Sequence, residues 1–145
     1  MRRIAVLTLL CGIALTYLAF APKVVQVAPE AISLQDKLKI TKTASGALLF
    51  VDNGFFNRKS SVAKFVDFEF KQYITKQYGT VNIQELLIQN PGCRSFQAAS
   101  ALCNSFKVER VVLPWFDKKL SKSAWRQFFE LRRLLEQKNI PFVRG

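Results

Sequence analysis

The sequence contains no histidine, the side chain that most often acts as a general base or metal ligand near neutral pH. Its absence excludes the serine–histidine–aspartate and cysteine–histidine catalytic arrangements. Only three cysteines are present, and Cys11 lies in a long apolar run, which argues against a zinc site. The six glycines are isolated, and the G-x-x-x-x-G-K pattern of a phosphate-binding loop is missing. The commonest hydrolase and nucleotide-binding signatures are therefore absent.

Acidic residues are also scarce, because 10 Asp and Glu stand against 22 Lys and Arg in a chain of net charge +12. Arg2 and Arg3 account for two of these positive charges, which leaves about +10 on the rest of the chain. The basic residues are spread along the sequence rather than gathered in one block. This balance favours an anionic partner, either an anionic lipid surface or an acidic protein face. Nucleic acid is a less favoured partner for an exported domain.

The longest uncharged segment comprises residues 4–21, directly after Arg2 and Arg3. As a helix it would be roughly 27 Å long, close to the thickness of the hydrocarbon core of a bilayer. The apolar core of a cleavable signal peptide is shorter, about 7–15 residues. The best small-x-small cleavage site, at residues 19–21, is followed by Pro22, whose fixed φ and missing amide hydrogen fit a peptidase cleft poorly. We therefore predict an uncleaved transmembrane signal-anchor helix.

The basic residues at the two ends of this segment predict its orientation. The amino group of Met1 lies with Arg2 and Arg3 on one side, whereas Lys23 stands alone just beyond the other. The positive-inside rule then places the amino terminus in the cytoplasm and the remaining chain outside, in the periplasm of a bacterium. The predicted parts are a cytoplasmic tip (1–3), a single-pass membrane helix (4–21), a linker (22–36) and one compact exported α/β domain (37–145).

The first half of the domain predicts two strands and a helix. Residues 37–42 alternate between charged and apolar, as in a half-exposed strand, and residues 47–51 are continuously apolar, as in a buried strand. Residues 43–46 between them are a turn candidate. A helix is expected from Ser60 or Ser61 to Tyr78, because apolar residues recur at three- and four-residue spacing and Gly79 follows as a C-cap.

The second half predicts a strand–helix–strand unit after two further helices. Asn82 and Glu85 have capping-box spacing before a short helix over 85–89, and a longer helix starts near Ser95. Residues 108–116 and 140–143 read as strands, joined by a helix that Ser121 or Ser123 caps and that runs to Lys138. Strands joined in this way are parallel. The predicted inward-facing side chains are Phe96, Ala99, Leu102, Cys103 and Phe106 on the first of the longer helices, and Trp125, Phe128, Phe129, Leu131, Leu134 and Leu135 on the second.

These segments predict the fold class α/β, with a small mixed or parallel sheet covered by helices and preceded by one N-terminal transmembrane helix. About 110 residues suit a single domain, and thirteen phenylalanines supply apolar surface for its core.

Two aspartates are the candidate catalytic residues. Asp52 and Asp117 each follow an apolar strand, at the edge where open α/β sheets place ligands. Together they could hold Mg²⁺ for phosphoryl chemistry, with Arg58, Lys118 or Lys119 binding phosphate. The competing interpretation is that Asp52-Asn53-Gly54 is simply a turn. The candidate anion-binding residues are Arg58, Lys118, Lys119, Arg126, Arg132 and Arg133; those on the last helix also fit a solvated face.

Cys93 and Cys103 are the candidates for a disulfide in an exported domain. A helix starting near Ser95 would separate them by roughly 15 Å, so a bridge requires residues 91–94 to fold back over the helix. Two free thiols are the alternative.

The sequence thus favours a membrane-anchored exported domain that acts as a binding or structural component of an envelope or transfer assembly, without a cofactor. The alternative is a metal-dependent phosphoesterase or nuclease using Asp52, Asp117 and Mg²⁺. A third hypothesis is a basic surface that binds anionic lipid beside the anchor.

Overall fold

A computed structural model describes residues 37–115 and 117–144 of the 145-residue chain. The membrane helix predicted for residues 4–21 and the linker over 22–36 lie outside the described residues. Within the described residues, no helix combines the length and apolarity needed to cross a bilayer.

The described residues form a mixed six-stranded sheet with the order β1-β2-β3-β5-β6, in which the short β4 also pairs with β3. The first strand is antiparallel to its neighbour, and all other pairs are parallel. The prediction of a mixed or parallel α/β sheet is confirmed at this level. The strands are β1 (Leu38–Lys42), β2 (Leu48–Asp52), β3 (Asn82–Ile88), β4 (Lys107–Val108), β5 (Val111–Leu113) and β6 (Phe142–Arg144).

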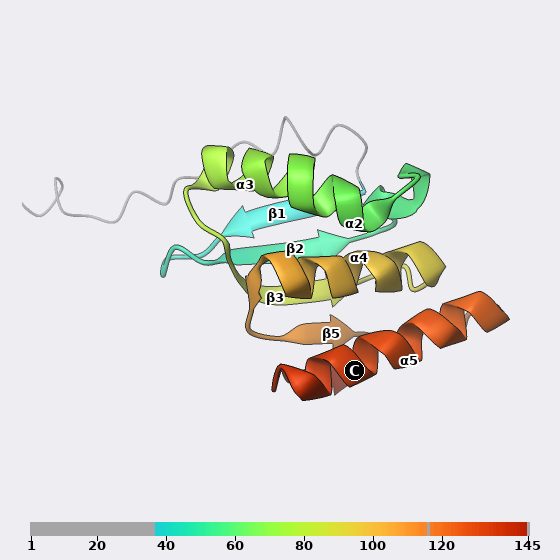
Figure 1. Cartoon of the computed structure of the whole chain (residues 1–145). Coiled ribbons are helices and arrows are strands. Elements are labelled where there is room, and N and C mark those ends of the chain that lie inside the picture. The colour runs from blue at the N-terminus through green and yellow to red at the C-terminus, as the bar shows by residue number, and fades with distance from the viewer. Residues whose placement is uncertain (1–36, 116, 145) are drawn as a thin grey trace, which may run out of the picture.

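The helices follow the strands in sequence, and Figure 1 shows them together on one face of the sheet. A short 3-10 turn, η3, leads into one continuous helical segment made of α2, η4 and α3. The helices α4 and α5 follow β3 and β5 and pack against each other. The bounds are η3 (Phe55–Arg58), α2 (Val62–Phe65), η4 (Val66–Phe70), α3 (Lys71–Tyr78), α4 (Cys93–Ser105) and α5 (Lys122–Gln137).

Strand register explains how a single helix layer covers this face. Phe50, Leu86, Val111 and Phe142 are cross-strand neighbours, so they point to the same side of the sheet. The ring of Phe50 contacts helical residue Phe70 at one end of this row. The ring of Phe142 contacts Phe128 of α5 at the other. Helices of the described residues therefore cover one face of the sheet. The sequence predicted that helices cover the sheet but did not distinguish its two faces.

The π-helical segment η4 keeps the long helix in register with the sheet. Val62, Val66, Phe70, Ile74 and Tyr78 are all buried, a spacing of four residues at every step. In a regular α-helix this spacing would rotate the apolar stripe by about 40° per step, because 3.6 residues complete a turn. A π segment is wound less tightly, so it returns the fourth residue towards the sheet. The predicted helix up to Tyr78 is confirmed, and Gly79 ends it with φ 68°.

The helix predicted over residues 85–89 is wrong, because residues 85–88 belong to the central strand β3. Ile83, Leu86 and Ile88 are buried against the helix layer, and β3 pairs with β2, β4 and β5. A register shift opposite Leu48 and Leu49 adds an extra residue, which breaks the strict alternation expected of a strand. Burial between neighbouring strands thus determines the structure of this segment, and the capping-box spacing of Asn82 and Glu85 does not mark the start of a helix.

Other boundaries differ in smaller ways. Helix α4 begins at Cys93, two residues before the predicted Ser95, and its five predicted inward-facing residues are all buried. The strand predicted over 108–116 is divided into β4 and β5, and the last strand ends at Arg144. On α5, Phe128, Leu131 and Leu135 are buried as predicted. Trp125 and Phe129 are 42% and 59% exposed, so the predicted apolar face is too wide.

An aromatic cluster fills the space between the first strands and the helix layer. Its rings lie with centroids 5.0–6.3 Å apart, mostly edge to face. This geometry is the favourable one for aromatic pairs. The members are Phe50, Phe55, Phe56, Phe65, Phe70 and Phe106.

Candidate functional site

The carboxyl ends of β2, β3, β5 and β6 lie at one edge of the sheet because these strands are parallel. Loops 53–61, 89–92 and 114–121 leave this carboxyl edge and lead into α2, α4 and α5. The chain also enters the domain here. Leu38 is paired with Asp52, and the amide of Asn53 donates to the carbonyl of Lys37 at 2.7 Å. Entry point and loops therefore share one edge.

This edge lacks the crevice of a doubly wound sheet. Ligands of such sheets bind where the strand order reverses, because the helices on either side of that point lie on opposite faces. Here each crossover leads from β2 to β3, from β3 to β5 and from β5 to β6, always in one direction. The helices accordingly stay on one face (Figure 1). A ligand at this edge would contact the described loops and helix N-termini.

Asp52 is almost fully buried at the end of β2 and holds the following loop. Its Oδ1 accepts hydrogen bonds from the amides of Gly54 and Phe55, both at 3.0 Å. Desolvation raises the pKa of this carboxyl to about 6, and the two amide hydrogen bonds partly oppose that rise. Gly54 takes φ 86°, which lets the chain turn directly after the strand. The predicted turn is confirmed, and the carboxylate supports it.

Amide side chains surround this turn and connect two further loops to it. A Cβ atom on Gly54 would lie 2.8 Å from Asn57 Nδ2 and 3.5 Å from Asn90 Nδ2. The carbonyl of Asn90 accepts from the buried hydroxyl of Ser95 at 2.8 Å, and its Oδ1 accepts from Lys118 Nζ at 3.5 Å. Sequence reasoning did not single out Asn90, and it named Ser95 only as the start of a helix. The signal was the Asn90-Pro91-Gly92 turn, whose partner in the first loop only the fold reveals.

Asp117 lies exposed in the loop before α5. The part of the chain described by the structure holds no group of three or more His, Cys, Asp or Glu side chains arranged for a metal ion. A magnesium ion at Asp52 and Asp117 would therefore need oxygen ligands of another kind.

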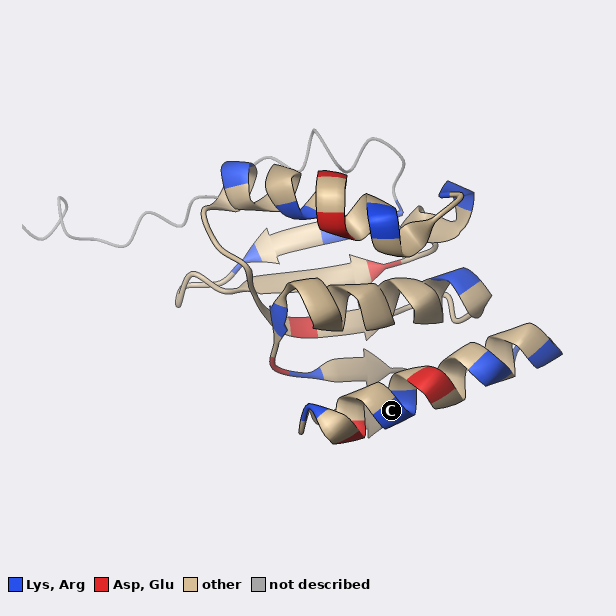
Figure 2. Ribbon diagram, in the orientation of Figure 1, with Lys and Arg blue, Asp and Glu red and all other residues tan. Residues whose placement is uncertain are grey.

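Positive charge gathers at the carboxyl edge. The first turns of α2, α4 and α5 contain no acidic residue, and helix N-termini carry partial positive charge themselves. Figure 2 shows basic residues where these helices begin. Asp52 and Asp117 are the acids of these loops. We call this set the basic edge: Lys37, Arg58, Lys59, Lys64, Arg94, Lys118, Lys119 and Lys122.

Among the predicted anion-binding residues, Arg58, Lys118 and Lys119 meet at the basic edge. The remaining three are distributed along α5, where Arg126 lies 3.9 Å from Glu130 and Arg132 lies 3.7 Å from Glu136. Those two are exposed i,i+4 pairs of a solvated helix face. Sequence reasoning missed Lys59, Lys64 and Arg94, because nothing in their local pattern indicates that their loops converge.

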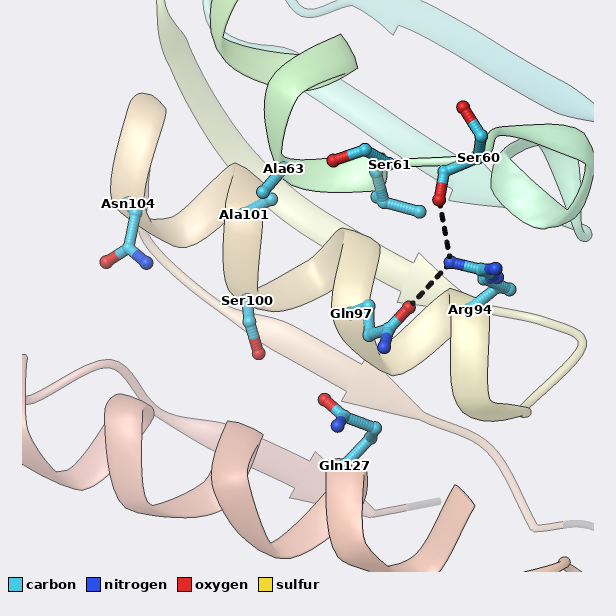
Figure 3. A pocket seen from close by; sticks show the side chains of 10 residues that line it. Ser60, Ser61, Ala63, Arg94, Gln97, Ser100, Ala101, Asn104 and Gln127 are labelled. Atoms are coloured by element: carbon cyan, nitrogen blue, oxygen red, sulfur yellow. Dashed lines mark hydrogen bonds between the residues drawn. The ribbon is translucent and has the colours of Figure 1, made fainter. Parts of the chain in front are cut away.

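A polar groove of about 350 Å³ lies beside Arg94, between the beginning of α2 and the outer face of α4, with Gln127 of α5 at its far side (Figure 3). Arg94 Nη1 donates to the carbonyl of Ser60 at 3.4 Å and to Gln97 Oε1 at 3.3 Å. The hydroxyl oxygen of Ser100 is buried and has no hydrogen-bond partner among the described residues. Apart from Arg94, the polar side chains lining the groove are uncharged.

Exposed aromatic side chains accompany the basic residues near β6. Trp115, directly after β5, is 71% exposed, and the guanidinium of Arg144 lies 5.5 Å from its ring centroid. Trp125 and Phe129 of α5 stack on each other with centroids 5.9 Å apart. Trp115 is thus a large apolar side chain that stands out from a loop of the carboxyl edge.

The face of the sheet opposite the helices carries an apolar row. Val51, Leu87, Val112 and Val143 are cross-strand neighbours on this face, and Leu49 lies beside them. They are half-buried or exposed, and no helix of the described residues covers them. We call these five residues the open apolar row. Glu85, paired with Arg110, lies on the same face next to Leu49.

Both candidate disulfide cysteines lie on α4 and are free thiols. Because the helix begins at Cys93 itself, residues 91–94 do not fold back over it as a bridge to Cys103 would require. Burial raises the pKa of the Cys103 thiol to about 12, so this thiol behaves as a small apolar core residue.

No protein-family model, curated protein or solved structure is significantly similar to this chain.

Proposed function

We propose that the chain is a single-pass membrane protein whose exported α/β domain binds another protein, as a structural component of an envelope or transfer assembly. The open apolar row is the observation that carries this proposal. The membrane attachment rests on the uncharged residues 4–21 and the basic residues before them.

The physical reason concerns the layers of the fold. Parallel sheets occur almost only with both faces covered, because their strands are apolar on both sides. In this domain α2, α4 and α5 cover one face, while Val51, Leu87 and Val112 of the central strands stand on the other. A second layer supplied by a partner would remove this row from water, as packed layers do within a domain. The uncovered apolar row therefore supports the proposed binding role.

Replacing Leu87, in the middle of the open apolar row, with lysine tests this role. We expect the wild-type chain, extracted in mild detergent, to run as a complex larger than a monomer. Leu87→Lys should reduce recovery of the complex about tenfold, because a charge buried in an apolar interface is strongly unfavourable. Blue native electrophoresis of matched membrane extracts measures this.

Thr41→Lys is the matched control, because Thr41 is exposed on β1 and lies on the same face outside the row. It should leave the complex intact. A wild-type chain that is strictly monomeric, or equal loss of the complex in both variants, would contradict a docking role for this face. Thermal unfolding of both variants separates lost binding from lost folding.

The alternative function, a metal-dependent phosphoesterase or nuclease, stays a hypothesis built on Asp52, Asp117 and Mg²⁺. Its carboxylates lie on loops of the same edge, but Asp52 Oδ1 already accepts two backbone hydrogen bonds. The geometry supports the binding role better.

A further inference from the structure

The entry point of the chain is the first clue to which surface of the domain faces the membrane. Lys37 is held at the carboxyl edge by the hydrogen bond from the amide of Asn53. The fifteen residues 22–36 connect this point to residues 4–21, the segment proposed to lie in the bilayer. The carboxyl edge is therefore the surface at which the tether begins, and a tether raises the local concentration of whatever it brings near.

The second clue is the charge of the same edge. Its eight basic residues come from the chain entry, two loops and three helix starts that are far apart in sequence but converge in the fold. Among the acids of the described residues, Glu69 lines a hollow with Lys59 and Lys64 beside this edge, whereas Glu109 lies between β4 and β5 at the opposite edge of the sheet. A juxtamembrane cluster of this size is attracted to a leaflet that contains anionic lipid.

The third clue is the exposed indole of Trp115. Its ring stands 71% exposed beside Arg144 and within three to four residues of Lys118 and Lys119. Tryptophan concentrates at the boundary between headgroups and acyl chains, because its ring is apolar while its N–H seeks a polar partner. The basic side chains and the indole of Trp115 therefore lie together on one surface that can face lipid.

The form of the basic edge fits a lipid surface better than a nucleic acid. Single-stranded nucleic acid is bound in a basic groove with several aromatic side chains on which bases stack. Here Trp115 is the one large aromatic side chain exposed on the described loops of this edge. The neighbouring groove is lined by serine, glutamine and asparagine rather than by aromatic residues (Figure 3). A basic surface formed by several loops, with one indole exposed on them, matches a layer of headgroups.

We propose that the basic edge rests on the anionic phospholipid surface of the membrane that anchors the chain, with the indole of Trp115 at the headgroup boundary. This inference rests on the membrane attachment in the proposed function. It fixes the orientation of the domain: the sheet edge faces the lipid, and the sheet face that carries the open apolar row stands roughly perpendicular to the bilayer, accessible to a protein partner. It also assigns Lys118, Lys119 and Trp115 a role in lipid contact.

Fluorescence of Trp115 in the full chain tests the proposal. Trp125→Phe leaves Trp115 as the sole tryptophan, since the sequence contains two. This variant is reconstituted into nanodiscs of phosphatidylcholine, with or without about 30% phosphatidylglycerol, and with acyl chains brominated near the headgroup. We expect quenching at least about twofold stronger in the anionic discs, falling to the neutral level as salt rises from about 0.05 to 0.5 M.

Lys118→Glu together with Lys119→Glu should abolish the extra quenching in anionic discs. Lys76→Glu with Lys107→Glu is the matched control. Both of these lysines are exposed, but they lie near the carboxyl end of α3 and at β4, at the opposite edge of the sheet. The control pair should retain the quenching. Circular dichroism confirms that both double variants are folded.

The outcomes separate the inference from the proposal on which it rests. If the chain is released from vesicles by carbonate and does not enter nanodiscs, the membrane attachment itself fails. If the chain is embedded but Trp115 is quenched equally in neutral and anionic discs, or both double variants lose quenching equally, the inference is overturned. If a single-stranded oligonucleotide shields the indole of Trp115 from solvent and anionic lipid does not, the edge is assigned to nucleic acid. That result would also overturn the inference.

Discussion

Replacing Phe70 with alanine is expected to lower the free energy of unfolding by about 3–5 kcal/mol, the usual cost of removing a buried phenylalanine ring. Phe70 is 3% exposed and lies at the centre of the aromatic cluster. Its ring centroid lies 5.4–6.1 Å from five others. The substitution removes these contacts and leaves a cavity between β2 and the π segment. Urea unfolding of the detergent-solubilised chain, followed by circular dichroism, measures the change.

Phe68→Ala is the matched control, because Phe68 lies two residues away on the same π segment but is 69% exposed. Its substitution should change the free energy of unfolding by less than about 0.5 kcal/mol. Similar losses for both variants would show that the helix does not present Phe70 to the sheet, and the role assigned to η4 would fail.

Asp52→Asn is expected to make the protein more stable at pH 7.5, by up to roughly 3 kcal/mol. This value corresponds to a folded pKa of about 6 against an ordinary value of 3.8. Because the folded state binds the proton more tightly, the contribution of Asp52 to wild-type stability is highest below pH 4. It falls as the pH rises from about 4 to 6, where the unfolded carboxyl ionises first. Asparagine cannot ionise, but its Oδ1 can still accept from Gly54 and Phe55.

Urea unfolding at pH 4 and pH 7.5 tests this prediction. Wild type should lose stability between the two values relative to Asp52→Asn, and the two proteins should be similar at pH 4. Asp52→Ala should be less stable than wild type at pH 4 by about 1–3 kcal/mol, since two amides lose their acceptor. Asp117→Asn changes an exposed carboxyl of the same edge and serves as the matched control. Parallel pH profiles for wild type and Asp52→Asn would contradict a buried, proton-binding Asp52.

The basic edge shows how far the sequence indicates a site. Asp52, Arg58, Lys118 and Lys119 were predicted from one rule, that loops after parallel strands meet at one sheet edge, and the structure brings their loops together. The same rule cannot find Arg94, which lies inside a helix start. It also cannot show that the Asp52 carboxylate is turned into the protein, because the atoms that bury it come from other segments.

Local patterns determined much of the fold. Strands β1 and β2 and the first helix were predictable, because each pattern reflects how one segment contacts a core. These patterns are the alternation of residues 37–42, the apolar run of 47–51 and the apolar stripe up to Tyr78. The Ser121 cap of α5 was predictable for the same reason, and its hydroxyl accepts from the amide of Ala124 at 3.2 Å. Net charge and the uncharged residues 4–21 likewise follow from the sequence alone.

Only the tertiary structure decided the rest, because strand pairing, packing and desolvation depend on residues distant in sequence. Residues 85–88 became part of a strand since β2 and β5 pair with that segment. The exposure of Trp125 and Phe129 depends on how α5 is rotated over β6, which helical periodicity does not specify. The order in which the strands join determines which face of the sheet remains uncovered. The single helix layer, the open apolar row and the raised pKa of Asp52 follow from that order.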